Sequence, residues 1–146
     1  MSHALYKFYI HYVFSTKKRL PLIKSDFEKR LWSYMAGIGK KYDVQVIQAG
    51  GTADHIHLLV SMPPDISVSK AIQLIKGNSS KWINDTYYPV DRQFKWQSGY
   101  AAFSVGQSNL KMVKHYILNQ KKHHQKMTYK EEYAKLINAH KIPQKT

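Results

Sequence analysis

The sequence contains no cysteine among its 146 residues. This absence excludes disulfide bonds and thiolate metal ligands, and it agrees with a reducing compartment. No apolar run approaches the roughly 20 residues that a membrane-spanning helix needs. The first five residues, Met1 to Leu5, lack the charged and apolar regions of a signal peptide. We therefore expect a soluble, cytoplasmic protein.

Acidic residues are scarce as well. Nine Asp and Glu stand against 23 Lys and Arg, which gives a formal net charge of +14 and a pI of about 9.9. A field of this sign attracts polyanions. Nucleic acid is the first expected partner; an anionic membrane surface is a distant second, because no basic amphipathic anchor helix is evident. Length and composition fit one folded domain over residues 1–146.

Hydrophobic periodicity divides the chain into strands and helices. Alternation predicts four strands, at residues 5–14, 44–49, 54–60 and 101–105. Helical spacing predicts helices at 26–41, with a capping box at Ser25 and Glu28, and from Ser67 to about Ser79. Residues 84–94 are expected to form a loop, with Pro89 as a breaker.

Two further helices are expected after the last strand. The first covers about 108–125 and begins at a Ser108 cap, and the second covers about 129–139. The order of elements is that of the ferredoxin-like or RRM-like βαββαβ fold, an α+β class with an antiparallel sheet and two helices on one face. The other sheet face needs a cover, and the 108–125 helix is the candidate.

The strand Asp54-His55-Ile56-His57-Leu58-Leu59-Val60 carries the first chemical signal. Because successive side chains of a strand alternate between faces, His55 and His57 point the same way, away from the core. Their imidazoles are spaced so that both can reach one cation. A histidine pair is also found in ordinary sheets, so a second group must support this interpretation.

Tyr116 and Gln120 supply that support. They lie four residues apart and share one helix face. A phenol can act as nucleophile on a phosphodiester, and an amide oxygen can complete a metal site made by two imidazoles. His123 lies near the same stripe and competes with Gln120 as third ligand. Mg²⁺ or Mn²⁺ suits such a mixed donor set and phosphate chemistry.

Five segments resemble the single-tyrosine HUH transposases of bacterial insertion sequences, the IS-two-hundred-like group, and they occur in that family's order. They are Thr16-Lys17-Lys18-Arg19, Asp54 to Val60, Leu74 to Ser80, Trp96 to Val105 and Tyr116 to His124. The resemblance implies a bacterial or archaeal DNA transposase. It implies Tyr116 as catalytic nucleophile and a metal held by His55, His57 and Gln120. It also implies a homodimer in which each active site combines the histidines of one subunit with the tyrosine of the other.

The implied reaction is the cleavage and rejoining of single-stranded DNA at the hairpin-bearing ends of an insertion sequence, through a 5′-phosphotyrosine intermediate. The competing interpretation is a non-catalytic, single-stranded nucleic-acid binding module with the same fold. A histidine-triad nucleotide hydrolase is set aside, because Leu59 stands where its third histidine would be. Contacts to the DNA backbone are expected from Lys17, Lys18, Arg19, Lys76, Ser79, Ser80, Lys111, Lys114, Lys121 and Lys122.

Overall fold

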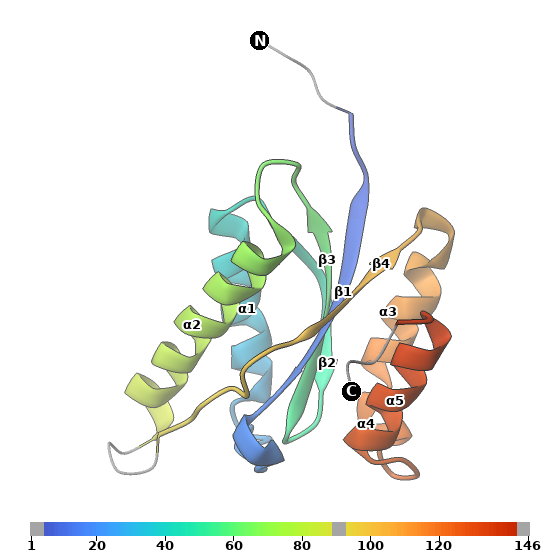
Figure 1. Ribbon diagram of the computed structural model, residues 1–146. Coiled ribbons are helices and arrows are strands. Elements are labelled where there is room, and N and C mark those ends of the chain that lie inside the picture. Colours follow the sequence, from blue (N-terminus) through green and yellow to red (C-terminus); the bar gives the residue numbers. More distant parts are fainter. Residues whose placement is uncertain (1–4, 89–92, 143–146) are drawn as a thin grey trace.

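The structure, a computed structural model, describes residues 5–88 and 93–142. Its centre is a four-stranded antiparallel sheet with the strand order β2-β3-β1-β4 (Figure 1). The strands are β1 (Phe8–Ser15), β2 (Gln45–Gly51), β3 (His55–Met62) and β4 (Ala101–Val105). The predicted α+β, ferredoxin-like fold class is confirmed.

Helices cover both faces of this sheet (Figure 1). On one face lie α1 (Glu28–Lys41) and α2 (Val68–Tyr87), the two crossover helices. On the other face lie α3 (Leu110–Leu118), α4 (Gln120–His123) and α5 (Tyr129–Ala139). Two short 3₁₀ turns, η1 (Lys17–Arg19) and η2 (Gln107–Asn109), follow β1 and β4. The sheet therefore separates the main core from the face that carries the histidines.

The main hydrophobic core fills the space between the sheet and α1 and α2. Tyr12 and Phe14 of β1 and Leu58 of β3 point into it, because they lie two residues apart on their strands or face each other across them. Leu31 of α1 and Ile75 of α2 pack into it from the helices. Each such side chain contributes about 1.5–3 kcal/mol on burial, so this face supplies most of the stabilisation and leaves the other face available for polar groups.

The helix starts show where local patterns succeed and fail. Ser67 caps α2, and its hydroxyl accepts a hydrogen bond from the Lys70 backbone N–H at 3.0 Å, as expected. The capping box predicted at Ser25 is wrong, because Phe27 is the N-cap of α1 and makes no side-chain cap bond. The predicted Ser108 cap is also wrong: Asn109 is the N-cap of α3 and makes no side-chain cap bond, and both residues belong to the η2 turn.

Helix α2 is longer than its pattern suggested. The helix was expected to end at about Ser79 and residues 84–87 to belong to a loop, but the helix continues to Tyr87. Asn78 and Ser80 donate side-chain hydrogen bonds to backbone carbonyls three or four residues earlier, which satisfies these polar groups inside a helix. Ile83 prolongs the apolar face into the core. The expected breaker, Pro89, lies outside the described residues.

The helix expected over about 108–125 is divided at Asn119 into α3 and α4. Helix α3 packs on β2 at Gly50, and only glycine fits there. A Cβ atom at this position would lie 2.3 Å from the carbonyl oxygen of Ile117. This close approach brings α3 and α4 close to β3, the strand that carries His55 and His57.

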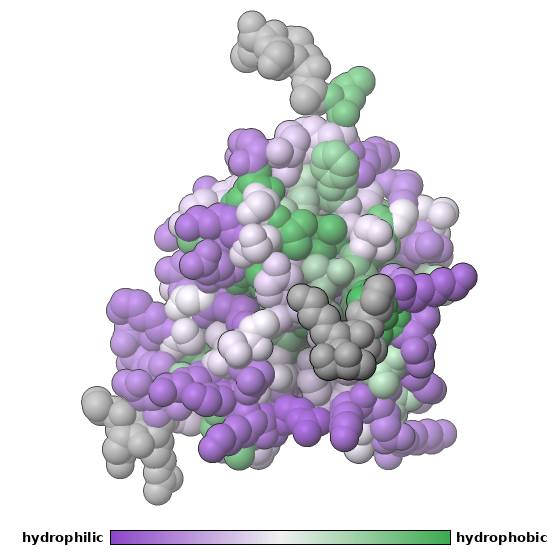
Figure 2. All heavy atoms as spheres, in the orientation of Figure 1, coloured by the Kyte–Doolittle hydropathy of each residue, from purple (hydrophilic) through white to green (hydrophobic). Residues whose placement is uncertain are grey.

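The surface is predominantly polar. In Figure 2 hydrophilic residues occupy the lower border of the molecule, where η1 lies, and more hydrophobic residues gather in the upper middle of the face. Within residues 5–88 and 93–142, no helix combines the length and the apolar composition that crossing a membrane requires.

Candidate active site

Strand β3 presents its histidine pair to the face covered by α3, α4 and α5. His55 and His57 are both 0% exposed, and their ring centroids lie 5.2 Å apart. Ile56 and Leu58 alternate with them and pack in the core on the opposite face. The strand therefore directs two imidazoles to one buried centre.

Asp54 and Thr52 orient the ring of His55. The Nδ1 atom of His55 lies 2.8 Å from Asp54 Oδ1 and 2.9 Å from Thr52 Oγ1. A proton on Nδ1 donated to the carboxylate leaves Nε2 directed at the centre, which is the arrangement of histidines that bind metals. Burial acts to lower the pKa of His55, but hydrogen bonds with Asp54, Glu132 and Gln120 outweigh it and raise this pKa to about 9.

His11 of β1 orients the ring of His57 in a similar way. Its Nε2 atom lies 2.8 Å from Nδ1 of His57. Burial, together with the neighbouring His57, lowers the pKa of His11 to about 3, so His11 is neutral and can accept a hydrogen bond. Burial also lowers the pKa of His57. If Nε2 of His57 binds a metal, the neutral ring can donate from Nδ1 to His11; without a metal, a proton on Nε2 can be donated to Glu132.

Tyr116 and Gln120 reach the same centre from α3 and α4. The Tyr116 ring stands edge-on to the ring of His57, with centroids 5.7 Å apart. The amide oxygen of Gln120 lies 3.0 Å from Nε2 of His55, and the residue is only 1% exposed. The structure thus brings together all four residues that the sequence assigned to catalysis and metal binding.

Glu132 of α5 is the member of the site that the sequence analysis missed. It is 1% exposed. Its Oε1 lies 3.0 Å from His57 Nε2, and its Oε2 accepts hydrogen bonds from the Gln120 amide, at 2.8 Å, and from the Tyr116 hydroxyl. Burial acts to raise the pKa of Glu132, but hydrogen bonds with His55 and His57 hold it far below its ordinary value.

A helical-wheel signal could have identified Glu132. In the sequence Glu131 and Glu132 form an acidic pair on a short helix, which suggests two solvated side chains. However, Tyr129 lies three residues before Glu132 and Leu136 four residues after it, so all three share one face. Tyr129 and Leu136 pack against a small apolar cluster on the sheet, and that face carries Glu132 inward.

The two histidines after Gln120 differ in their contacts. The ring of His123, the competing third ligand, lies 4.9 Å from the Tyr116 ring. His124 instead contacts both Gln120 Oε1, at 3.1 Å, and Glu132 Oε1, at 3.0 Å. Gln120 contacts His55, whereas His123 contacts Tyr116.

The donor set at this centre fits a divalent cation. His55, His57 and Glu132 offer ligand atoms that all lie within 4.8 Å of one another. Imidazole nitrogen and carboxylate oxygen are ligands for several divalent metals, and the amide oxygen of Gln120 adds a further hard donor. The negative charge of Glu132 would offset part of the charge of a bound cation.

The residues expected to contact DNA fall into two groups. Lys17, Lys18, Arg19, Lys111, Lys114 and Lys122 are exposed. The others have internal partners: Lys76 donates to the carbonyls of Gln97 and Gly99, Ser79 is fully buried beside Trp96, Ser80 donates to the Gly77 carbonyl, and Lys121 pairs with Glu28. For Ser79 the burial supports a structural role, because its hydroxyl accepts from the Trp96 indole at 3.1 Å.

Fold and site define a class: a small basic α+β domain whose sheet face holds two histidines, an amide and a tyrosine in one buried centre. Comparison with known families agrees with this description. Residues 4–120 match the family model described as "Transposase IS200 like". The chain belongs to this family, and its general function is that of a DNA-processing transposase.

Individual relatives support the assignment. The chain is 27% identical over 124 residues to the "Transposase for insertion sequence element IS200" of Salmonella typhimurium and to that of Salmonella typhi, covering 82% of this chain and 81% of each relative. Among solved structures, its fold is similar to that of a putative transposase from Deinococcus radiodurans, with a TM-score of 0.67 and 18% identity over 82% of this chain and 95% of the other.

A second solved structure is a REP-associated tyrosine transposase bound to a REP hairpin. It has a TM-score of 0.55 and 12% identity over 80% of this chain and 68% of the other. At these identities both structures support the fold alone. The family match ends at residue 120, so His124, α5 and Glu132 lie outside the matched segment.

Proposed function

We propose that this protein cleaves and rejoins single-stranded DNA at the ends of an insertion sequence, with Tyr116 as nucleophile and a divalent metal ion as cofactor. The observation that carries the proposal is the convergence of the Tyr116 hydroxyl with His55, His57 and Gln120 in one buried centre. Family membership supports DNA as the substrate.

The metal would be held by His55, His57 and Gln120, with Glu132 as an additional ligand. Mg²⁺ or Mn²⁺ fits this mixture of nitrogen and oxygen donors. When bound, the ion would withdraw charge from the phosphate oxygens of the substrate. Asp54 and His11, through the Nδ1 atoms of the two histidines, would hold both rings in the orientation that ligation requires.

Tyr116 would attack a phosphodiester of the DNA. Burial, followed by its hydrogen bond to Glu132, raises the pKa of Tyr116, so its phenol is neutral until it reacts. Attack forms a bond from the tyrosine oxygen to phosphorus and breaks the bond from phosphorus to the 3′ oxygen. The phenol loses its proton, and the departing strand takes one up as a 3′-hydroxyl. The 5′-phosphate stays on Tyr116.

Because of this covalent intermediate, we expect the rejoining step to need no nucleoside triphosphate such as ATP. The phosphotyrosine bond is itself a phosphodiester, so the 3′-hydroxyl of another strand can attack it and release Tyr116. Hydrolysis would discard the intermediate. We therefore expect strand transfer to be the main outcome, and simple nicking a side reaction.

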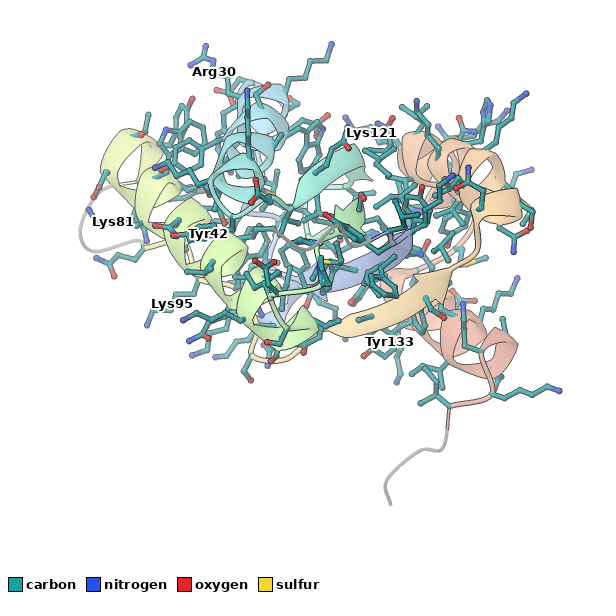
Figure 3. The ribbon with its side chains drawn as sticks, turned by 90° about the horizontal axis from the view of Figure 1, so that it is seen from above. Arg30, Tyr42, Lys81, Lys95, Lys121 and Tyr133 are labelled. Atoms are coloured by element: carbon teal, nitrogen blue, oxygen red, sulfur yellow. The ribbon has the colours of Figure 1, made fainter. Side chains whose placement is uncertain are left out.

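Tyr116→Phe tests the nucleophile, because it removes only the hydroxyl. We expect it to bind single-stranded DNA from the flanks of its own gene as the unaltered protein does, and to form no covalent protein–DNA adduct on a denaturing gel. Tyr42→Phe is the matched control, since Tyr42 is an exposed tyrosine at the end of α1, away from the site (Figure 3). An adduct that persists in Tyr116→Phe would refute the assignment.

The alternative is a binding module without catalysis. It is favoured by the exposed rings of Tyr6 and Phe8, which stack 6.1 Å apart at 14° near the start of β1 and resemble a platform for bases. The two functions are distinguished by the covalent adduct, which a binding module cannot form.

We further propose that the partners are hairpin DNA and a second copy of this chain. The hairpin is suggested by the solved tyrosine transposase that is bound to one. A homodimer is supported by Met112 and Leu118 of α3, which are 65% and 57% exposed. Within one chain, Tyr116 lies beside His57 of the same chain. Exchange of α3 between two subunits would give the shared sites that the family resemblance implies.

A further inference from the structure

A cavity of about 510 Å³ opens beside the histidine site. Its walls come from the end of β1, the η1 turn, the 97–100 loop and α5. Tyr133 of α5 lines it, and Figure 3 shows this residue beside β4. The proposed chemistry at Tyr116 does not use this cavity.

The lining combines aromatic rings with cations. Tyr129 and Tyr133 of α5 provide two rings, with centroids 5.8 Å apart, whereas the ring of Tyr100 packs edge-on against Tyr12 of the main core. Lys18 and Arg19 contribute positive charge at the edge formed by η1. Flat rings stack on nucleobases of any sequence, and cations bind the attached phosphates. This combination suits a nucleotide better than a purely apolar or purely anionic ligand.

The cavity is close to the catalytic centre. Tyr129 lines it, and the Tyr129 ring centroid lies 4.6 Å from that of His55. Ser15, also in the lining, is the register partner of His55 across β1 and β3. One aromatic ring therefore separates the cavity from the metal ligands. A DNA strand with a phosphate at the centre would place a neighbouring nucleotide at the cavity.

The wall opposite α5 is held in place by hydrogen bonds. The Lys76 ammonium donates to the carbonyls of Gln97 and Gly99, both at 2.8 Å. The Gln97 backbone N–H donates to Ser15 at 2.8 Å, and the Lys18 N–H donates to the Gln97 side chain at 3.2 Å. These bonds fix the 97–100 loop against β1 and η1, so the cavity is formed before any ligand arrives.

We propose that this cavity binds one unpaired nucleotide adjacent to the phosphodiester that Tyr116 attacks. The base stacks on the ring of Tyr133, and its phosphate faces Lys18 and Arg19. The proposal rests on the proposed function for the position of the scissile phosphate. The bound base would position the DNA strand at the catalytic centre, independently of the hairpin.

The test measures binding without cleavage. Tyr116→Phe protein in EDTA is titrated with fluorescently labelled single-stranded DNA from the flanks of its gene, and the Kd is read from anisotropy. Adding Tyr133→Ala should raise the Kd by about tenfold, the effect of one lost stacking contact. Tyr42→Ala, at an exposed tyrosine away from the cavity, should leave the Kd unchanged. Thermal unfolding followed by circular dichroism confirms that each variant is folded.

An abasic scan of the DNA locates the nucleotide. An abasic position next to the cleaved phosphate should weaken binding of the Tyr116→Phe protein about as much as Tyr133→Ala does. It should weaken the Tyr133→Ala protein no further, because both changes remove one contact. Equal, additive losses at every position, or an unchanged Kd for Tyr133→Ala, would overturn the proposal.

A second variant guards against indirect effects of Tyr133→Ala on packing, because Tyr133 also contacts a small apolar cluster on the sheet. Lys18→Gln leaves all rings in place, and it should reduce the salt dependence of binding by about one phosphate contact. An unchanged salt slope would contradict the placement of the phosphate. Failure of the proposed function is seen separately, as the absence of any adduct on Tyr116 in the metal-loaded protein.

Discussion

Among single residues, Glu132 contacts the largest share of the site. Its two oxygens contact His55, His57, Gln120, Tyr116 and His124. A buried carboxylate is costly unless charged or hydrogen-bonding groups surround it. The five contacts supply that compensation in the metal-free protein, and a bound cation would supply it in the loaded one.

Substituting Glu132 by Gln tests its role as a metal ligand. The amide retains the size of the side chain but removes the negative charge. We expect the affinity for Mn²⁺, measured by isothermal titration calorimetry, to fall about tenfold or more. Glu131→Gln is the matched control: this neighbour is exposed and belongs to the α5 capping box, in which Gln can replace Glu. Equal affinities for Glu132→Gln and the unaltered protein would exclude Glu132 from the ligands.

The raised pKa of His55 predicts a proton release on metal binding. Its pKa in the metal-free fold is about 9, above the ordinary 6.5, so His55 is protonated at neutral pH. The stabilisation from this charge is fully present below 6.5 and is lost as the pH rises through about 9. A metal needs the neutral ring, so its affinity should increase with pH until the pH passes that value.

Calorimetry in buffers with different ionisation enthalpies measures this release. We expect close to one proton per Mn²⁺ bound at neutral pH, decreasing towards zero above the pKa of His55. A metal affinity that does not change with pH would show that His55 is already neutral in the metal-free protein.

At the residue scale the sequence could identify the groups whose spacing follows a regular period. His55 and His57 follow the period of a strand, and Tyr116 and Gln120 follow that of a helix. Helical spacing could have shown that Glu132 faces the sheet, but Glu132 lies 75 residues from His57 in sequence, and no periodic pattern links residues on separate elements. Its contact depends on how α5 packs on the sheet, which is a tertiary property.

Among the elements, the packing of α3 on the sheet decides whether the nucleophile reaches the histidines. Gly50 permits this packing, since a Cβ there would lie 2.3 Å from the Ile117 carbonyl oxygen. Ile117 directly follows Tyr116, so any displacement of the helix moves the phenol as well.

Gly50→Ala should therefore impair both stability and adduct formation, although it alters no group of the site. We expect a loss of about 1–3 kcal/mol in the free energy of unfolding, from urea denaturation, as for other overpacked positions. Gly77→Ala is the matched control, because a Cβ at this position within α2 meets nothing within 4 Å. It should increase stability by about 0.5–1 kcal/mol. An unaffected Gly50→Ala protein would show that α3 can shift without consequence.

The order of elements was predictable because strand alternation and helical spacing are strong over several residues. Helix ends were less predictable. The Ser25 and Glu28 pair matches a capping box in sequence, yet tertiary packing sets Phe27 as the cap of α1, where its ring is buried in the core. The polar stretch near Ser79 suggested a helix end, but Trp96 supplies a partner for Ser79 from outside the helix.

Over the whole molecule, the sheet divides two tasks. One face packs with α1 and α2 and supplies the core, and the other holds the polar centre under α3, α4 and α5 (Figure 1). The net charge of +14 favours the binding of DNA by many separate phosphate contacts. Substitution of His55 or His57 should therefore abolish cleavage and leave most DNA binding intact.

Mixing two inactive variants tests the shared active sites of the proposed homodimer. His57→Ala lacks a ligand and Tyr116→Phe lacks the nucleophile, so neither forms an adduct alone. If α3 is exchanged, the mixed dimer contains one site with the intact histidines of one subunit and the intact tyrosine of the other. We expect adduct formation to return in the mixture, on the His57→Ala chain only. A mixture that remains inactive would assign each site to a single chain.

Tyr116 as the nucleophile is the central claim, and mass spectrometry of the trapped complex tests it most directly. The protein is incubated with Mg²⁺ and single-stranded DNA from the flanks of its gene, and the adduct is digested with protease and nuclease. We predict a nucleotide linked through its 5′-phosphate to the peptide that contains Tyr116. A nucleotide on Tyr129, Tyr133 or any other residue, or an adduct that forms undiminished in excess EDTA, would contradict the mechanism.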